Sequence, residues 1–192
     1  MLRALRLAFA LLAFGAGFAC AEEIEVREAA LASSEEGIVL NADFELELTA
    51  RLEDALAKGV PLYFLVEFEC TRPRWYWLDE RIGAAALALR LSFHALTRTY
   101  RLSSGTFHRS YATLAEALFA LGRVREWLVL PRGALKPDTT YVAYVRMRLD
   151  TTQLPKPFQV SALANREWTL ASSWKRWEVN GSALALAGEA PK

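Results

Sequence analysis

The sequence predicts a mainly β protein, an antiparallel β-sandwich of immunoglobulin-like character with two short helices. Two observations support this prediction. Several segments alternate between apolar and polar residues, which is typical of strands that bury one face. Turn residues separate these segments at short intervals, without the strand–helix alternation of a parallel α/β sheet. A closed β-barrel is the alternative architecture.

The first clear strand is predicted over residues 38–49, IVLNADFELELT. Apolar residues occupy every second position from Ile38 to Leu48, while Glu45 and Glu47 lie on the other face. Residues 51–59 change to helical spacing and end in glycine, which predicts a short helix with a glycine cap.

The segment 60–70, VPLYFLVEFEC, alternates again and predicts a second strand. Its register places Cys70 in the core, where a buried thiol is unreactive. Residues 87–96 predict a long strand, and residues 97–111 predict a hairpin that turns at the Ser-Ser-Gly of 103–105.

A second helix is predicted over 113–124, where Thr113 and Glu116 form a capping-box pattern. Two further strands are predicted, a short one at Trp127–Leu130 and a longer one at Tyr141–Leu149.

The remaining segments are predicted with weaker patterns. Prolines predict an extended conformation for LPKPF, residues 154–158. A last strand is expected near 166–172. The small residues of 181–192 predict a flexible C-terminal tail.

The chain opens with a predicted secretory signal peptide, residues 1–21. Arg3 and Arg6 precede an apolar run that is shorter than the about 20 residues of a membrane span. Small residues flank Cys20, as a signal peptidase requires, so cleavage after Ala21 predicts a periplasmic or secreted protein. Lipid anchoring at Cys20 is the less favoured alternative, because the residue three positions before it is not the expected leucine.

Residues 22–180 are predicted to form a single domain, which suits the size of one compact core. Cys70 is the only cysteine after the predicted cleavage site, so no disulfide is expected within the domain.

Charge is distributed unevenly along the chain. Residues 22–70 carry 13 acids and three bases, whereas residues 71–192 carry nine acids and 18 bases. We expect acidic strands to lie beside arginine-bearing strands and to pair across the sheet. The alternative is a bipolar surface that meets a charged partner. The near-neutral total offers no basic face for nucleic acid.

The residue types of common catalytic sites are scarce. His94 and His108 are the only histidines, and both fall on the polar side of predicted strands. The chain has no glycine-rich phosphate loop, no G-x-S-x-G and no C-x-x-C, and one cysteine with two histidines cannot supply a structural zinc site. We therefore expect no enzyme, no metal and no cofactor, and keep a hydrolase using Glu67 and Glu69 as a minor hypothesis.

The segment TRPRWYWLDE, residues 71–80, contains the candidate site. A proline ends the preceding strand, and Trp75 and Trp77 are expected to share one face. The favoured interpretation is that these aromatic rings close one end of the core. The alternatives are a partner-binding patch that includes Arg72 and Arg74, and a surface that contacts carbohydrate or a membrane.

Several blocks of the chain resemble a bacterial secreted family known only as a domain of unknown function, number 4390. These blocks are GVPLYFLVEFECTRPRWYWLDE, LSFHALTRTYRLS, LGRVREW, YVRMRLDTTQLPKPFQVSAL and NREWTLASSW. The resemblance spans roughly Glu25 to Trp177 and implies no reaction, ligand or catalytic residue. Genes of that family often neighbour a two-component sensor kinase of the nitrogen-regulation type, so by analogy the resemblance implies an envelope partner.

Together these observations predict a non-enzymatic periplasmic protein-interaction module, with the periplasmic domain of a sensor kinase as the candidate partner. The alternative is a periplasmic protein that binds a small ligand or carbohydrate. No nucleic acid and no membrane span after signal cleavage are expected. The candidate partner-binding residues are Arg72, Arg74, Trp75, Trp77, Pro155, Pro157 and Phe158.

Overall fold

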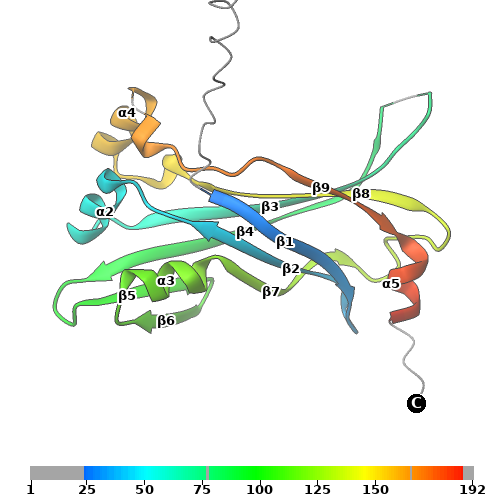
Figure 1. Cartoon of the computed structure of the whole chain (residues 1–192), viewed down its shortest axis with the longest axis horizontal. Helices are drawn as coiled ribbons and strands as arrows, with labels where there is room; N and C mark the ends of the chain where they lie inside the picture. Colours follow the sequence, from blue (N-terminus) through cyan, green and yellow to red (C-terminus); the bar gives the residue numbers. More distant parts are fainter. Residues whose placement is uncertain (1–23, 77, 165, 188–192) are drawn as a thin grey trace, which may run out of the picture.

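The computed structural model describes residues 24–76, 78–164 and 166–187. The chain folds into two antiparallel sheets with short helices (Figure 1). A small sheet has the strand order β1-β2-β7, and a large sheet has the order β6-β5-β4-β3-β8-β9. The predicted signal peptide, residues 1–21, and Trp77 lie outside the described residues.

The elements follow one another along the chain in this order. They are β1 (Ile24–Ser33), β2 (Gly37–Leu46), α2 (Ala50–Ala57), β3 (Leu62–Arg72), β4 (Glu80–His94), β5 (Thr99–Ser104), β6 (Phe107–Tyr111), α3 (Leu114–Leu121), β7 (Arg123–Pro131), β8 (Thr140–Leu149), the 3-10 turn η1 (Thr151–Gln153), α4 (Lys156–Ala164), the 3-10 turn η2 (Arg166–Trp168), β9 (Lys175–Asn180) and α5 (Gly181–Ala187).

The predicted class, a mainly β protein with two antiparallel sheets, is confirmed, but its immunoglobulin-like character is not. In an immunoglobulin domain the third, sixth and seventh strands share one sheet. Here β3, β4, β5 and β6 form a continuous antiparallel meander in the large sheet, and β7 crosses to the small sheet.

The core lies between the two sheets and is built from the alternating strands. In β3 every second residue from Leu62 to Cys70 is fully buried, as the alternation predicts. The facing residues of β2 and β8, such as Leu40 and Val145, are fully buried as well. Burial raises the pKa of the Cys70 thiol to about 11, so the thiolate is scarce at neutral pH.

Both predicted helices form, each with the expected cap. Thr49 accepts a hydrogen bond from the Leu52 amide at the start of α2, and Gly59 follows its end with a left-handed φ of 86°. At the start of α3, Thr113 and Glu116 make the predicted capping box.

Helix α4 corrects the prediction of an extended LPKPF segment. It begins at Lys156, and the Phe158 amide donates a 2.9 Å hydrogen bond to the Pro155 carbonyl. Proline is tolerated in the first turn of a helix, because the amide hydrogens there have no partner within the helix. The two prolines therefore mark a helix start.

Three other predictions are corrected near the ends of the described chain. Strand β1 had no predicted counterpart. The last strand is β9, not 166–172, where Ala171 makes only an isolated bridge to Arg148. The expected flexible tail begins as α5, which is fixed by burial of Leu184 and by a 2.9 Å hydrogen bond from Ser182 Oγ to Asp138.

The predicted pairing of acids with arginines across strands is confirmed on the outer face of the large sheet. Glu67 on β3 accepts hydrogen bonds from Arg146 at 2.5 Å and from Arg148 at 3.3 Å, both on β8. Glu69 lies two residues along β3 and accepts from Arg81 of β4 at 2.8 Å. Burial alone would raise the pKa of Glu67, but the two arginines outweigh it and lower that pKa.

We predict that Glu67→Gln lowers the free energy of unfolding by about 1 to 3 kcal/mol, because two guanidinium groups lose their shared charged acceptor. The Glu67 side chain is only 22% exposed, so solvent screens this interaction weakly. Urea denaturation measures the change. Glu69→Gln is the matched control: its side chain is 39% exposed and its partner Arg81 62%, and we expect a loss of about 0 to 1 kcal/mol. Equal losses in the two variants would contradict the prediction.

The lowered pKa of Glu67 also predicts how stability depends on pH. Its stabilising contribution is present above the ordinary carboxyl pKa of 4.5 and is lost as the pH falls through the lower folded value. The Glu67→Gln variant lacks this contribution at every pH. The difference in the free energy of unfolding between wild type and variant should therefore decrease below about pH 4.5. Denaturation midpoints measured across this range test it, and a gap that stays constant would refute it.

Candidate functional site

The candidate site from the sequence is the turn between β3 and β4, which we call the aromatic loop (residues 73–79). The two strands pair as far as Arg72 opposite Glu80, so the loop lies at the tip of a long hairpin. β3 pairs with β8 only as far as Thr71, and the hairpin projects beyond its neighbours at the upper right of Figure 1. Among the strands of the described residues, none of the small sheet is paired with or continues over this tip.

Trp75 and Tyr76, the described aromatic residues of the loop, face solvent. Trp75 is 93% exposed, and the side chains of Tyr76 and Leu78 are 68% and 83% exposed. The Trp75 and Tyr76 rings contact each other edge to face, with centroids 4.9 Å apart. The expectation that this segment closes the core is therefore wrong for Trp75, and Trp77 lies outside the described residues.

Glu80 connects the two arginines at the base of the loop. It forms an ion pair with Arg72 and another with Arg74, the latter at 2.7 Å. The hydrogen bond from Arg74, together with the charge of Arg72, holds the pKa of Glu80 below its ordinary value. Arg72 and Arg74 thus brace the hairpin, and Glu80 balances part of their charge.

The second predicted segment lies far from the aromatic loop. Pro155 and Pro157 are exposed at the start of α4, whereas the Phe158 ring packs on Trp168 with centroids 5.2 Å apart. This segment follows Leu149, which pairs with Phe64 at the opposite end of β3 from the loop. The 11 residues of β3 separate the two ends by about 35 Å. The predicted residues therefore do not form one surface.

The groups considered for catalysis do not converge. Glu67 and Glu69 are engaged by arginines, His94 contacts Thr97, and His108 lies on the distant strand β6. Among residues 24–76, 78–164 and 166–187, no three His, Cys, Asp or Glu side chains gather as a metal site would require. No helix in that same part of the chain is long and apolar enough to cross a membrane.

Sequence reasoning missed a groove of about 370 Å³ beside α3. It is lined by residues of β4, β5, β6, α3 and β7, including Arg109. Alternation along the hairpin could have placed Phe107, Arg109 and Tyr111 on one face. Nothing local in the sequence indicates that α3 and β7 lie opposite that face.

These features define a class: a two-sheet antiparallel β domain with a projecting aromatic loop and, among the described residues, no cluster of three metal-ligating side chains. Residues 21–178 match the model of the family described as Domain of unknown function (DUF4390), so the chain belongs to this family. The resemblance noted from the sequence blocks is thereby confirmed. No curated protein and no solved structure matches the chain.

We predict that Trp75→Ala changes the free energy of unfolding by less than about 0.5 kcal/mol, because the ring is 93% exposed and buries little area. Trp168→Ala is the matched comparison. That ring is 6% exposed, and its loss should cost about 3 to 5 kcal/mol. Thermal or urea unfolding of both variants measures the difference. A large destabilisation by Trp75→Ala would mean that the Trp75 ring is part of the core.

Proposed function

We propose that this protein is a non-enzymatic periplasmic interaction module whose aromatic loop anchors a partner protein. The observation that carries the proposal is the 93% exposure of Trp75 at the tip of a braced hairpin, beside the exposed Tyr76. Tryptophan, tyrosine and arginine are the residues most enriched among interface hot spots. Covering an exposed apolar cluster of this kind with a partner lowers the free energy of the complex.

The hairpin supports the proposal because it holds the loop ready for binding. The ladder between β3 and β4 runs to Arg72 and Glu80, and Glu80 of β4 forms ion pairs with Arg72 of β3 and with Arg74 of the loop. A loop that is ordered before binding loses less conformational entropy on association.

The charge balance around the loop favours a protein partner over an anionic membrane surface. Binding to anionic lipids needs an excess of lysine and arginine. Here Glu80 neutralises part of the charge of Arg72 and Arg74, Arg81 is paired with Glu69, and the loop carries Asp79. The loop therefore presents aromatic area with balanced charge.

The compartment and the partner in this proposal come from the sequence. The predicted signal peptide, residues 1–21, supports a periplasmic location. The family resemblance supports the periplasmic domain of a two-component sensor kinase as the first partner to test. Among the described residues, the site binds through surface area and performs no reaction in this proposal.

We expect the chain without residues 1–21 to bind the purified periplasmic domain of the candidate two-component sensor kinase, as measured by calorimetry. Combined Trp75→Ala and Tyr76→Ala substitution should weaken binding by about 2 kcal/mol or more, roughly 30-fold, because two anchors are truncated. Leu96→Ala is the matched control, since Leu96 is also 93% exposed but lies in the turn between β4 and β5. Unchanged binding by the double variant would rule out the loop as the anchor.

Two further measurements separate the parts of the proposal. Photo-crosslinking from position 76 in intact envelope should trap a protein, and the same crosslinker at position 96 should not. A trapped protein other than the kinase would change the partner but keep the mode of binding. If the chain instead floats with lipid vesicles in a manner that needs Trp75, the loop is a membrane anchor and the protein-binding proposal fails.

A further inference from the structure

The two long edges of the sandwich differ. At one edge, β1 approaches β9, and Lys175 Nζ donates hydrogen bonds to the carbonyls of Val26 and Arg27 at 3.3 and 2.8 Å. At the other edge, β6 and β7 end the two sheets without pairing to each other. The groove of about 370 Å³ lies at this open edge, which we call the open-edge groove.

The floor of the open-edge groove is apolar. Leu87 and Leu89 of β4 and Leu102 of β5 line it, and all three also pack on the core. Phe107 of β6 lines its rim with 83% of the residue exposed. An apolar ligand body resting on these side chains would extend the core outward and remove their remaining surface from water.

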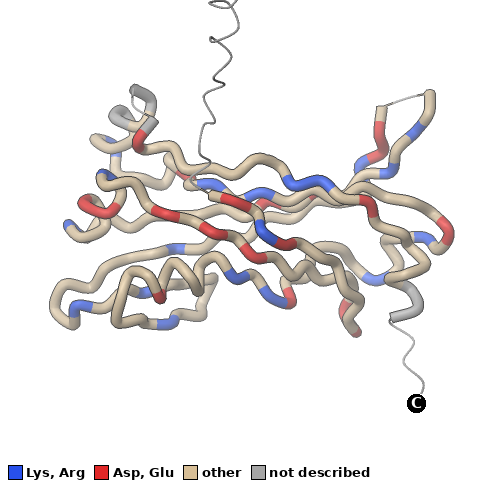
Figure 2. Tube along the Cα trace, viewed as in Figure 1, with Lys and Arg blue, Asp and Glu red and all other residues tan. Residues whose placement is uncertain are grey.

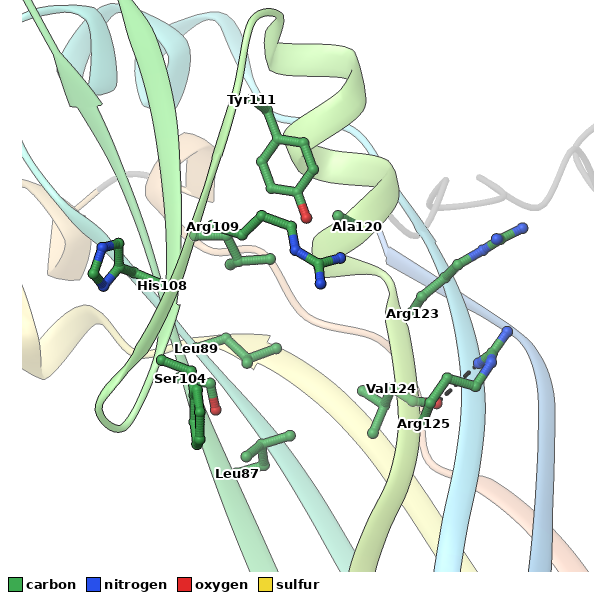
Figure 3. Close-up of a pocket in the computed structure, with 12 residues that line it drawn as sticks. Leu87, Leu89, Ser104, His108, Arg109, Tyr111, Ala120, Arg123, Val124 and Arg125 are labelled. Atoms are coloured by element: carbon green, nitrogen blue, oxygen red, sulfur yellow. Dashed lines mark hydrogen bonds between the residues drawn. The ribbon is translucent and has the colours of Figure 1, made fainter.

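Arg109 provides the charge of the groove. Its guanidinium points into the space between β6 and α3, and the Tyr111 hydroxyl is turned toward it (Figure 3). Within the described part of the chain, Arg109 has no ion pair or hydrogen bond, and no acidic side chain lines the groove. An arginine next to apolar surface without a carboxylate is suited to receive an anion.

The other two arginines of the lining are occupied. Arg125 donates to Asp43 at 2.6 Å and to the Ala42 and Val124 carbonyls at 2.9 Å, and it points away from Arg109 (Figure 3). Arg123 also points away, with its guanidinium 4.0 Å from the centre of the Phe119 ring. The groove therefore offers one unpaired cation, which fits a ligand with one negative charge.

A second hollow shows the contrast. It has a volume of about 520 Å³, lies on the other side of α3 and is lined by Arg27 and Arg123. Each of these cations has an acidic neighbour: Arg27 is paired with Glu45, and Arg123 lies 3.9 Å from Asp43. It has no unpaired cation, so the anion argument applies only to the open-edge groove.

We propose that the open-edge groove binds a small amphipathic monocarboxylate, such as a fatty acid. The carboxylate is held by the Arg109 guanidinium with the Tyr111 hydroxyl as a second donor, and the chain of the ligand lies on Leu87, Leu89 and Leu102. A groove of this volume, with an apolar floor of leucines and polar side chains along its wall, is of the size that holds small ligands. This inference is independent of the aromatic loop, which lies at a different hairpin.

The test uses the chain without residues 1–21 and decanoate below its micelle concentration, with binding measured by calorimetry. We expect saturable binding at one site, at least about tenfold weaker binding of decanol, which lacks the charge, and no binding of acetate, which lacks the chain. Arg109→Met keeps an unbranched apolar side chain similar to the aliphatic part of arginine and should weaken decanoate binding about 10- to 100-fold by removing a charged hydrogen-bond donor.

Matched variants decide whether the groove is the site. Arg101→Met removes the same charge from β5 on the face opposite Leu102, so it should bind decanoate like wild type. Leu87→Trp fills the floor without changing charge and should abolish binding. Thermal unfolding confirms that each variant is folded, and Trp75→Ala should bind decanoate normally.

Three results would overturn the inference. Decanoate fails to bind the folded wild-type chain, or decanol binds as tightly as decanoate, or Arg101→Met weakens binding as much as Arg109→Met. The last outcome would mean that general surface charge attracts the ligand. None of these results bears on the aromatic loop, so failure here is distinguishable from failure of the proposed function.

Discussion

The alternation of β3 is the constraint on which the rest of the structure depends. Its buried face carries Leu62, Phe64, Val66, Phe68 and Cys70, each fully buried. Its outer face carries Glu67 and Glu69, which arginines of the two neighbouring strands engage. A shift of one residue would place both carboxylates in the core and the apolar side chains of the buried face in water. The register of β4 and β8 is thus specified from both faces, and with it the position of the loop that β3 and β4 carry.

Much of this fold could be predicted because the controlling signals are local. Period two identified β2, β3, β4, the β5–β6 hairpin and β8, while helical spacing that ends at Gly59 and the capping box at Thr113 identified two helices. The imbalance of charge between the two parts of the chain indicated the cross-strand pairs. Strand β1 escaped prediction because its alanines and charged residues make a weak pattern. It forms a strand because it pairs with one edge of β2. The pairs run from Ile24 opposite Leu46 to Ser33 opposite Ile38.

The candidate site was harder to predict because periodicity shows which side chains share a face but not what covers it. Trp75 follows a half-buried strand closely in the sequence, yet it lies past the last pairs of β3 with β8, at Thr71, and with β4, at Arg72. Whether a tryptophan is a core residue or a surface anchor therefore depends on the relative lengths of strands distant in sequence. For the same reason Pro155 and Trp75, both selected from composition, proved to lie near opposite ends of β3. A buried tryptophan contributes to stability through the area it buries, whereas Trp75 is 93% exposed, and this exposure is the observation behind the proposed binding role.

The open-edge groove follows from the unequal size of the two sheets. Six strands face three, so the β5–β6 side of the large sheet extends beyond the small one (Figures 1 and 2). Helix α3 covers part of this overhang and is held there at its end, where Gly122 accepts a 2.8 Å hydrogen bond from the Phe44 amide of β2. A Cβ at position 122 would lie 2.1 Å from the Phe44 carbonyl oxygen, so only glycine allows so close an approach. The same contact that brings α3 over the sheet leads the chain directly into β7. The helix cannot slide further over the leucines of β4 and β5 without drawing β7 away from β2, and a strip of apolar surface beside Arg109 therefore stays open.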